Sequence, residues 1–234
     1  MTDSSADFFR ALDARVDRYD LLQHPYYQAW SAGELTKDDL REYAAEYWHH
    51  VSAFAAYLSA LHSRLPDGTL RRTVLENLAE EEGLGGAGPA HSDLWMDFAK
   101  GMGAQESAVR EREIGEETQA LLEHFRAAMT QTPAAALAAL YAYESRVPAI
   151  ATTKAEGLEK HYAADATTRR YFTVHTTADV LHAQVWREAL TAELAARPQD
   201  ADAALTAAED AAKALWATLD GVEKKRQERV AVAA

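Results

Sequence analysis

The amino-acid sequence predicts an all-α protein, a single-domain bundle of about seven helices. Three observations predict this class. Alanine is abundant, apolar residues recur with the period of a helix and without the alternation of a strand, and proline or glycine separates the periodic segments. No long linker divides the 234 residues, so one domain over residues 1–234 is expected, with its core at about residues 6–220.

Charge and composition exclude several classes of function. Lys and Arg total 24 and Asp and Glu total 37, which gives a net charge of −13. An acidic surface repels phosphate backbones and anionic lipids, so neither a nucleic acid nor a membrane is an expected partner. The first residues lack the features of a signal peptide, and no apolar run reaches the roughly 20 residues that span a bilayer. These features favour a cytoplasmic protein.

The helical segments follow one another along the whole chain. They are expected at about residues 6–22, 37–65, 70–82, 91–100, 106–129, 133–161, 167–195 and 200–229. The first ends at the His24-Pro25 step. Thr36 is the N-cap of the second, with Asp39 at its third helical position, and Pro66 ends it. The third stops at a glycine-rich stretch over residues 83–89, and the short fourth helix follows directly.

The second half of the chain is expected to form longer helices. The segment 106–129 is periodic throughout. Pro133 begins the next helix, which continues to about His161, and Pro148 within it predicts a kink and not an end. One uninterrupted helix is expected over 167–195, and a last one over 200–229.

The segment 167–195 carries the most informative residues. His175, Asp179 and His182 stand at positions i, i+4 and i+7, which fall within about 60° of one another on a helix. Two imidazoles and a carboxylate on one face suit iron, manganese or zinc. The alternative is an ordinary buried polar cluster, and this segment alone does not decide between the two.

Two more segments add candidate ligands. The run Glu80-Glu81-Glu82 ends a helix, where acidic side chains are unfavourable against the helix dipole, so it is either a solvated charge run or a place where Glu81 binds a cation. His91 then joins Glu81 from the start of the next helix. Glu144 stands at an inward position of an apolar helix, and a buried carboxylate needs a partner, such as a metal ion.

Together these segments supply three carboxylates and three histidines. The chain has no cysteine, so thiolate sites and a cysteine nucleophile are excluded and any metal is held by His, Asp, Glu or Tyr. Six such ligands can hold two metal ions and leave positions open for O2. A ferritin-type bundle is disfavoured, because only Glu46-Tyr47-Trp48-His49 follows its Glu-x-x-His motif.

Several segments resemble a known family in the same order. They are His24–Thr36, Tyr57–Arg64, Asn77–Glu82, His91–Trp95, Ala139–Ser145 and His175–His182. From about Leu21 to Leu190 the chain resembles the haem-oxygenase-like diiron oxidases. Within them it resembles the group formed by the Chlamydia protein associating with death domains and its bacterial relatives in folate metabolism. One departure is a glycine-rich loop before His91 that is longer than expected for this family.

The resemblance implies a compact helical bundle with two metal ions, Fe/Fe or Fe/Mn, that uses O2 and an external reductant. The implied metal ligands are Glu81, His91, Glu144, His175, Asp179 and His182. The implied activity is the formation of para-aminobenzoate (4-aminobenzoate) for folate from the enzyme's own side chains.

In that activity Tyr27, in the Tyr26-Tyr27-Gln28 turn, supplies the aromatic ring, and Lys154 supplies the amino nitrogen. Tyr43, Tyr143 and Tyr171 also match tyrosine positions of the family and are expected near the metals. By residue type alone, Tyr27 would instead be a core anchor and Lys154 a solvated lysine.

Other functions stay open at this point. The same dimetal oxidase could act on an external substrate, such as an amino acid or a fatty acid. A metal-free enzyme is the second alternative, since pyrroloquinoline quinone synthases have a similar fold; haem binding through His24 would leave the carboxylates unexplained. A binding module is the third, suggested only by the chlamydial relative's name. A homodimer is expected by analogy of fold.

Overall fold

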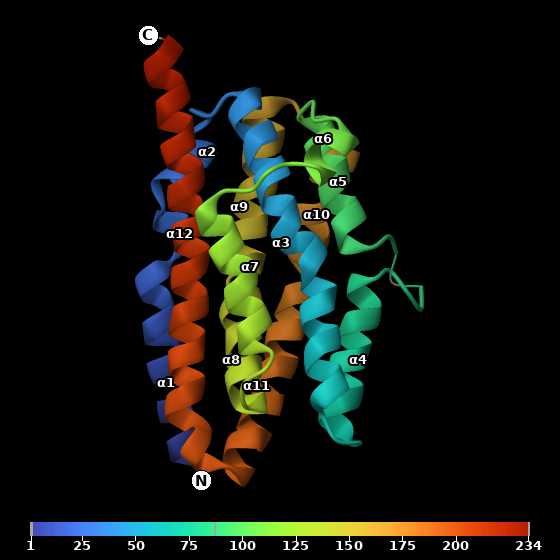
Figure 1. Ribbon diagram of the computed structural model, residues 1–234, viewed down its shortest axis with the longest axis vertical. Coiled ribbons are helices and arrows are strands. Elements are labelled where there is room, and N and C mark those ends of the chain that lie inside the picture. The colour runs from blue at the N-terminus through green and yellow to red at the C-terminus, as the bar shows by residue number, and fades with distance from the viewer. Residues whose placement is uncertain (1, 87, 234) are drawn as a thin grey trace.

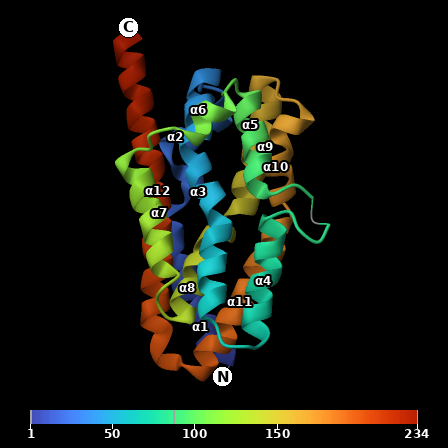
Figure 2. The same cartoon turned by 45° about the vertical axis from the view of Figure 1, so that its right-hand side comes forward.

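The all-α prediction is confirmed. The computed structural model describes residues 2–86 and 88–233, and these residues contain no β-strand. The helices run up and down along one long axis (Figures 1 and 2). They are α1 (Thr2–Val16), α2 (Pro25–Ala32), α3 (Lys37–Arg64), α4 (Thr69–Glu81), α5 (His91–Gly101), α6 (Glu106–Arg110), α7 (Glu116–Ala128), α8 (Pro133–Glu144), α9 (Val147–Tyr162), α10 (Ala166–His175), α11 (Ala178–Ala196) and α12 (Ala201–Ala233).

Helix α8 forms the centre of the bundle. Every residue from Ala134 to Ala142 is buried, and so is Glu144. A helix that is apolar on all sides must be covered on all sides, and α8 packs against α12, α11 and α7. Helix α12 runs along the length of the molecule, and its C-terminal end extends past the other helices (Figure 1). No described helix combines the length and the apolar character needed to cross a membrane.

The start of α3 is as predicted. Thr36 accepts a hydrogen bond from the backbone N–H of Asp39 at 3.1 Å, and the Asp39 carboxylate accepts one from the Thr36 N–H at 2.9 Å. This reciprocal capping satisfies two donors at the helix start. It anchors a helix of 28 residues that packs against α4, α5 and α7.

The sequence analysis did not predict helix α2, which contains Tyr27. The sequence predicted a turn, but Pro25 occupies the first helical position, where its missing N–H costs nothing. The His24 ring accepts a hydrogen bond from the Tyr26 N–H as N-cap, and Gly33 ends the helix in the left-handed conformation. The first helix is correspondingly shorter than expected: it ends at Val16, and 3-10 turns over Asp17–Tyr19 and Leu21–Gln23 follow it.

Three helices expected to be continuous are each divided in two, which raises the count above seven. Gly115 caps α7, so the expected helix over 106–129 breaks after α6. Pro148 lies in the first turn of α9, and α8 has already ended at Glu144, so the proline separates two helices where a kink was expected. Between α10 and α11, the hydroxyls of Thr176 and Thr177 bond to carbonyls three residues back and compete with the helical pattern.

Candidate functional site

The breaks between helices position the six predicted metal ligands. Glu81, Glu144 and His175 are the last residues of α4, α8 and α10, His91 is the first of α5, and Asp179 and His182 lie in the first two turns of α11. All six side chains are buried, none more than 8% exposed. His175 and Asp179 thus come from two helices and not from one, yet they face the same interior space.

The long glycine-rich loop still brings His91 to Glu81. Gly83 has φ +69°, and a Cβ on it would lie 2.6 Å from the backbone nitrogen of Ala90. Only glycine permits both the left-handed backbone and this close approach. The loop therefore folds back tightly after Glu81 and delivers His91 to the same end of the site.

Glu81, His91 and His175 form the first group, with one donor atom from each within 4.8 Å of the others. His91 Nδ1 lies 2.9 Å from Glu81 Oε2 and 3.1 Å from His175 Nε2. His175 Nδ1 lies 2.6 Å from the carbonyl oxygen of Tyr171 and donates to it, which directs Nε2 to the centre of the group.

Glu81, Glu144 and His182 form the second group, again within 4.8 Å. Nδ1 of His182 lies 3.3 Å from Oε1 of Glu144 and 3.3 Å from Oδ1 of Asp179. Asp179 belongs to neither group of three, but it lies against His182 and lines the same small cavity as Glu81 and Glu144. Glu81 belongs to both groups, as a carboxylate that bridges two ions would.

Two buried atoms of the second group lack hydrogen-bond partners. They are Oε1 of Glu144 and Nδ1 of His182, which lie 3.3 Å from each other without forming a hydrogen bond. The outer atoms of the same side chains are occupied, because Trp186 donates to the other oxygen of Glu144, and His182 Nε2 lies 3.1 Å from Glu80 Oε2. Buried polar atoms without partners are costly, so this arrangement fits a cation.

The pKa shifts of the buried ligands also favour a bound cation. Burial raises the pKa of Glu144, and it lowers the pKa of His175. Burial also opposes the proton on His182, but Asp179 and Glu144 outweigh it and raise the pKa of His182. Without metal the cluster therefore retains protons that cations would displace. Nitrogen and oxygen ligands of this kind suit iron and manganese.

The second part of the site joins Lys154 to Tyr27 and Tyr43. Lys154 Nζ lies 2.5 Å from the Tyr27 hydroxyl and 2.7 Å from the Tyr43 hydroxyl, and the two hydroxyls are 2.9 Å apart. Helices α9 and α2 can approach here because Gly157 has no side chain: a Cβ there would lie 2.8 Å from Trp30. Lys154 is 5% exposed and Tyr27 is 3% exposed.

Among the described residues, no carboxylate forms an ion pair with the Lys154 amine. Its side-chain hydrogen bonds go to the two tyrosines, and burial holds its pKa well below the ordinary value for lysine. The expectation of a solvated lysine from residue type alone is therefore wrong. Burial likewise raises the pKa of Tyr27 and of Tyr43, so both phenols stay protonated.

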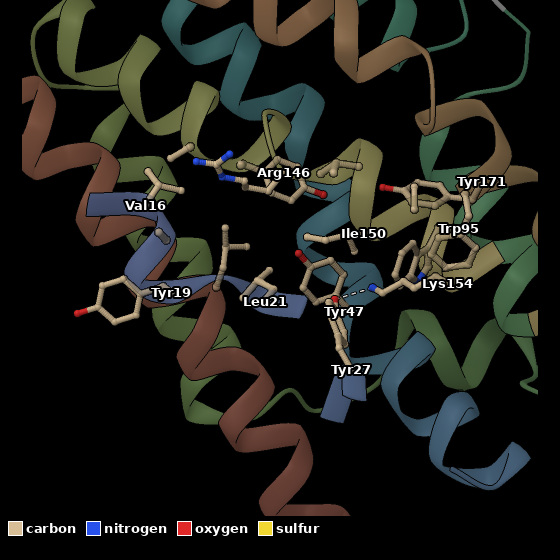
Figure 3. Close-up of a pocket in the computed structure, with 17 residues that line it drawn as sticks. Val16, Tyr19, Leu21, Tyr27, Tyr47, Trp95, Arg146, Ile150, Lys154 and Tyr171 are labelled. Atoms are coloured by element: carbon tan, nitrogen blue, oxygen red, sulfur yellow. Dashed lines mark hydrogen bonds between the residues drawn. The ribbon is translucent and has the colours of Figure 1, made fainter. Parts of the chain in front are cut away.

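Each part of the site has its own cavity, and the two cavities share two lining residues. One, of about 40 Å³, is lined by Tyr27, Lys154 and Tyr47 and by mostly apolar side chains (Figure 3). A smaller polar one is lined by Glu81, Glu144, His175 and Asp179. Tyr143 and Tyr171 line both cavities, and the Tyr171 ring stacks on His175 with centroids 4.0 Å apart. These two tyrosines therefore lie between the acidic cluster and the lysine.

The structure also adds residues to the site and closes one alternative. Glu80 contacts His182 and Trp186 contacts Glu144. Both residues stand in sequence segments that carry proposed ligands, but no spacing pattern in a sequence identifies a residue that only contacts a ligand. His24 uses one ring nitrogen to cap α2 and the other to bond Asp220 at 3.1 Å, so neither is free to bind haem.

Comparisons with known proteins agree with this architecture. Residues 41–216 match the model of a family described as iron-containing redox enzymes. The chain is 37% identical over 206 residues to 4-aminobenzoate synthase of Chlamydia pneumoniae, covering 88% of this chain and 90% of that one. It is 38% identical over 229 residues to 4-aminobenzoate synthase of Nitrosomonas europaea, covering 93% of this chain and 91% of that one.

The fold itself has solved counterparts. A domain with a haem-oxygenase-like fold from Shewanella denitrificans superimposes with a TM-score of 0.80 at 19% identity, covering 95% of this chain and 93% of that one. At this identity the likeness concerns the fold alone.

Proposed function

Because the chain belongs to the family of haem-oxygenase-like iron-containing redox enzymes, we propose that it is a 4-aminobenzoate synthase that makes its product from Tyr27 and Lys154. In this proposal the Cα–Cβ bond of Tyr27 is broken, its ring and Cβ become the ring and the carboxyl carbon of the product, and O2 is the oxidant of Cβ. The nitrogen of Lys154 replaces the phenolic oxygen, which leaves as water, and the Cε–Nζ bond of the lysine is broken. Two metal ions, Fe/Fe or Fe/Mn, are the cofactor, O2 is the oxidant, and an external donor supplies electrons.

The six buried side chains would hold the two ions. Glu81 would contact both, His91 and His175 would bind one, and Glu144, His182 and Asp179 would bind the other. When bound, the ions would supply the redox chemistry toward O2 that no side chain can perform. Trp186 and Glu80 would hold Glu144 and His182 in place from outside, the usual role of groups around a metal site.

The observation that carries the proposal is the position of Lys154. Its amine lies 3.9 Å from the centre of the Tyr27 ring, compared with 4.8 Å for Tyr43 and 5.3 Å for Trp30. A lysine must be neutral to donate its nitrogen, and burial without a carboxylate favours the neutral form. The amine is thus directed at one ring, in the form that can react.

Tyr43 would act as a positioning residue. Its hydroxyl bonds both the Tyr27 hydroxyl and the Lys154 amine, and its ring stacks on Tyr47 at 5.5 Å. It therefore holds the two reacting groups against each other. The rings of Trp30 and Phe172 also lie close to the amine, at 5.3 Å and 5.6 Å, and would help to exclude water from it.

The proposal is tested by loading the purified protein with iron, adding reductant and O2, and measuring both 4-aminobenzoate and the intact mass of the protein. The expected result is at most one product molecule per chain, with loss of mass at Tyr27. Tyr27→Phe removes the phenolic oxygen that nitrogen replaces and is expected to abolish the product. Tyr26→Phe is the matched control, because Tyr26 is buried in the same helix and bonds only the Asp39 carbonyl. A normal yield from Tyr27→Phe would refute the proposal.

A further inference from the structure

The apolar cavity beside Tyr27 has a basic residue at each end. Among its lining residues only Lys154 and Arg146 are of a basic type, and Arg146 is the one that is always charged. Arg146 immediately precedes α9, and Arg146, Ile150 and Lys154 recur every four residues along one face of it. Eight residues of helix span about 12 Å. In Figure 3 the Arg146 guanidinium lies on the Val16 side of the cavity and Lys154 on the Trp95 side.

One edge of the Arg146 guanidinium has no hydrogen-bond partner. Its Nε and Nη2 atoms are both buried and make no hydrogen bond, although Nη2 forms an ion pair with Asp17. Nη2 lies 2.7 Å from the Asp17 carboxylate and 3.6 Å from that of Asp13, but neither contact has hydrogen-bond geometry. Nε and Nη2 form the side of an arginine that binds a carboxylate through two parallel hydrogen bonds.

We propose that Arg146 and the apolar wall next to it form a binding site for the carboxylate of a small aromatic acid. Resting on the proposed function, the acid is the product, 4-aminobenzoate. Lys154 is neutral before the reaction and loses its amine in it, so Arg146 is the charged lining residue that can meet the carboxylate. The ring of the acid packs against Ile150, Leu21 and Leu215.

The room for this acid comes from Tyr27 itself. The cavity has about 40 Å³ while the Tyr27 ring is in place, and the space of that ring is added when the side chain leaves. The acid therefore binds to a chain without the Tyr27 ring, and the intact chain binds it weakly.

Two aspartates compete for Arg146. The side chain of Asp17 is 60% exposed and that of Asp13 is 33% exposed, so both can turn to water when a ligand carboxylate arrives. Loss of the Asp17 charge is accordingly expected to strengthen binding of the acid. Loss of Arg146 is expected to weaken it.

Equilibrium dialysis of metal-free protein tests the site with two probes, 4-aminobenzoate and its uncharged analogue 4-aminobenzamide. The host is Tyr27→Ala, or Tyr27→Leu if the first variant does not fold. We expect the acid to bind about tenfold or more tightly than the amide, since hydrogen bonds to charged groups are of that strength. Adding Arg146→Met should reduce this ratio to about one. Adding Asp17→Asn should increase it.

Arg187→Met is the matched control. Arg187 also faces Asp13, at 3.7 Å, but it does not line the cavity, so the ratio should stay unchanged. Equal binding of acid and amide in the host, absence of binding, or an unchanged ratio in Arg146→Met would each overturn the inference. The assay needs no turnover, so it can fail while the protein still makes 4-aminobenzoate, and it can succeed where synthesis fails.

Discussion

Replacing Lys154 with methionine tests whether a neutral amine is buried beside Tyr27. Lysine in an unfolded chain has a pKa of about 10.4, and burial lowers the pKa of Lys154 in the folded protein. Below about pH 10 the unfolded wild-type chain therefore binds a proton that the folded chain does not. Stability of the wild type relative to Lys154→Met must fall as pH falls, because the unfolded state binds more protons.

The size of the effect follows from the linkage relation. The difference in unfolding free energy between variant and wild type should grow by about 1.4 kcal/mol for each pH unit below about pH 10. It should level off once the pH falls below the pKa of Lys154 in the folded protein. The lost hydrogen bonds to Tyr27 and Tyr43 add a constant offset, because the pKa of each phenol is raised and neither titrates in this range.

The assay is chemical denaturation followed by circular dichroism at several pH values from 7 to about 10. Lys160→Met is the matched control, since Lys160 is an exposed lysine of the same helix, and it should show no such slope. A difference between Lys154→Met and the wild type that does not change with pH would refute the idea of a buried neutral amine. An equal dependence of the unfolding free energy on pH in Lys154→Met and Lys160→Met would also refute it.

Three further outcomes are expected. Glu80→Ala should weaken iron or manganese binding about 10- to 100-fold in a chelator competition, as loss of a group that orients a ligand usually does; Glu82→Ala, in the same acidic run but exposed, should not, and equal losses in both would contradict the assigned role. Trp186→Phe removes the donor to buried Glu144 and should lower the unfolding free energy by about 1.5–3 kcal/mol; an unchanged denaturation midpoint would argue against that bond. Glu46→Ala removes a buried carboxylate of α3 that pairs with Arg112 and accepts a hydrogen bond from the Gly115 N–H, and it should lower the free energy of unfolding by about 3–5 kcal/mol. A loss of unfolding free energy below about 1 kcal/mol would contradict a stabilising role for this ion pair.

Local signals in the sequence predicted much of this architecture. The Thr36 and Asp39 cap, the all-α class and the acidic or histidine residues at helix ends are features of short segments, which a single sequence displays. The expectation of one continuous helix through His175 and Asp179 was wrong, but it correctly placed the two side chains close together. The break at Thr176 and Thr177 is so short that the two side chains still face the same interior.

What the sequence could not predict depends on contacts between distant segments. Lys154 meets Tyr27 only because α9 and α2 approach closely at Gly157, and no local pattern marks that glycine as a point of contact. The environment of Arg146 is likewise set by distant segments, because Asp13 of α1 and Asp17 of the following 3-10 turn meet an arginine that immediately precedes α9. The helix breaks at Gly115 and Pro148 did have local signals, but the helical periodicity on either side concealed them.

The most direct test of the central claim follows the atoms of the protein into its product. Protein made with ring-13C tyrosine and side-chain-15N lysine is loaded anaerobically with iron, alone or with manganese, and then exposed to reductant and O2. We expect 4-aminobenzoate that carries both labels, in a yield of at most one molecule per chain, with matching loss of mass from the protein. Unlabelled product, or repeated turnover by protein of unchanged mass, would contradict it and identify an external substrate.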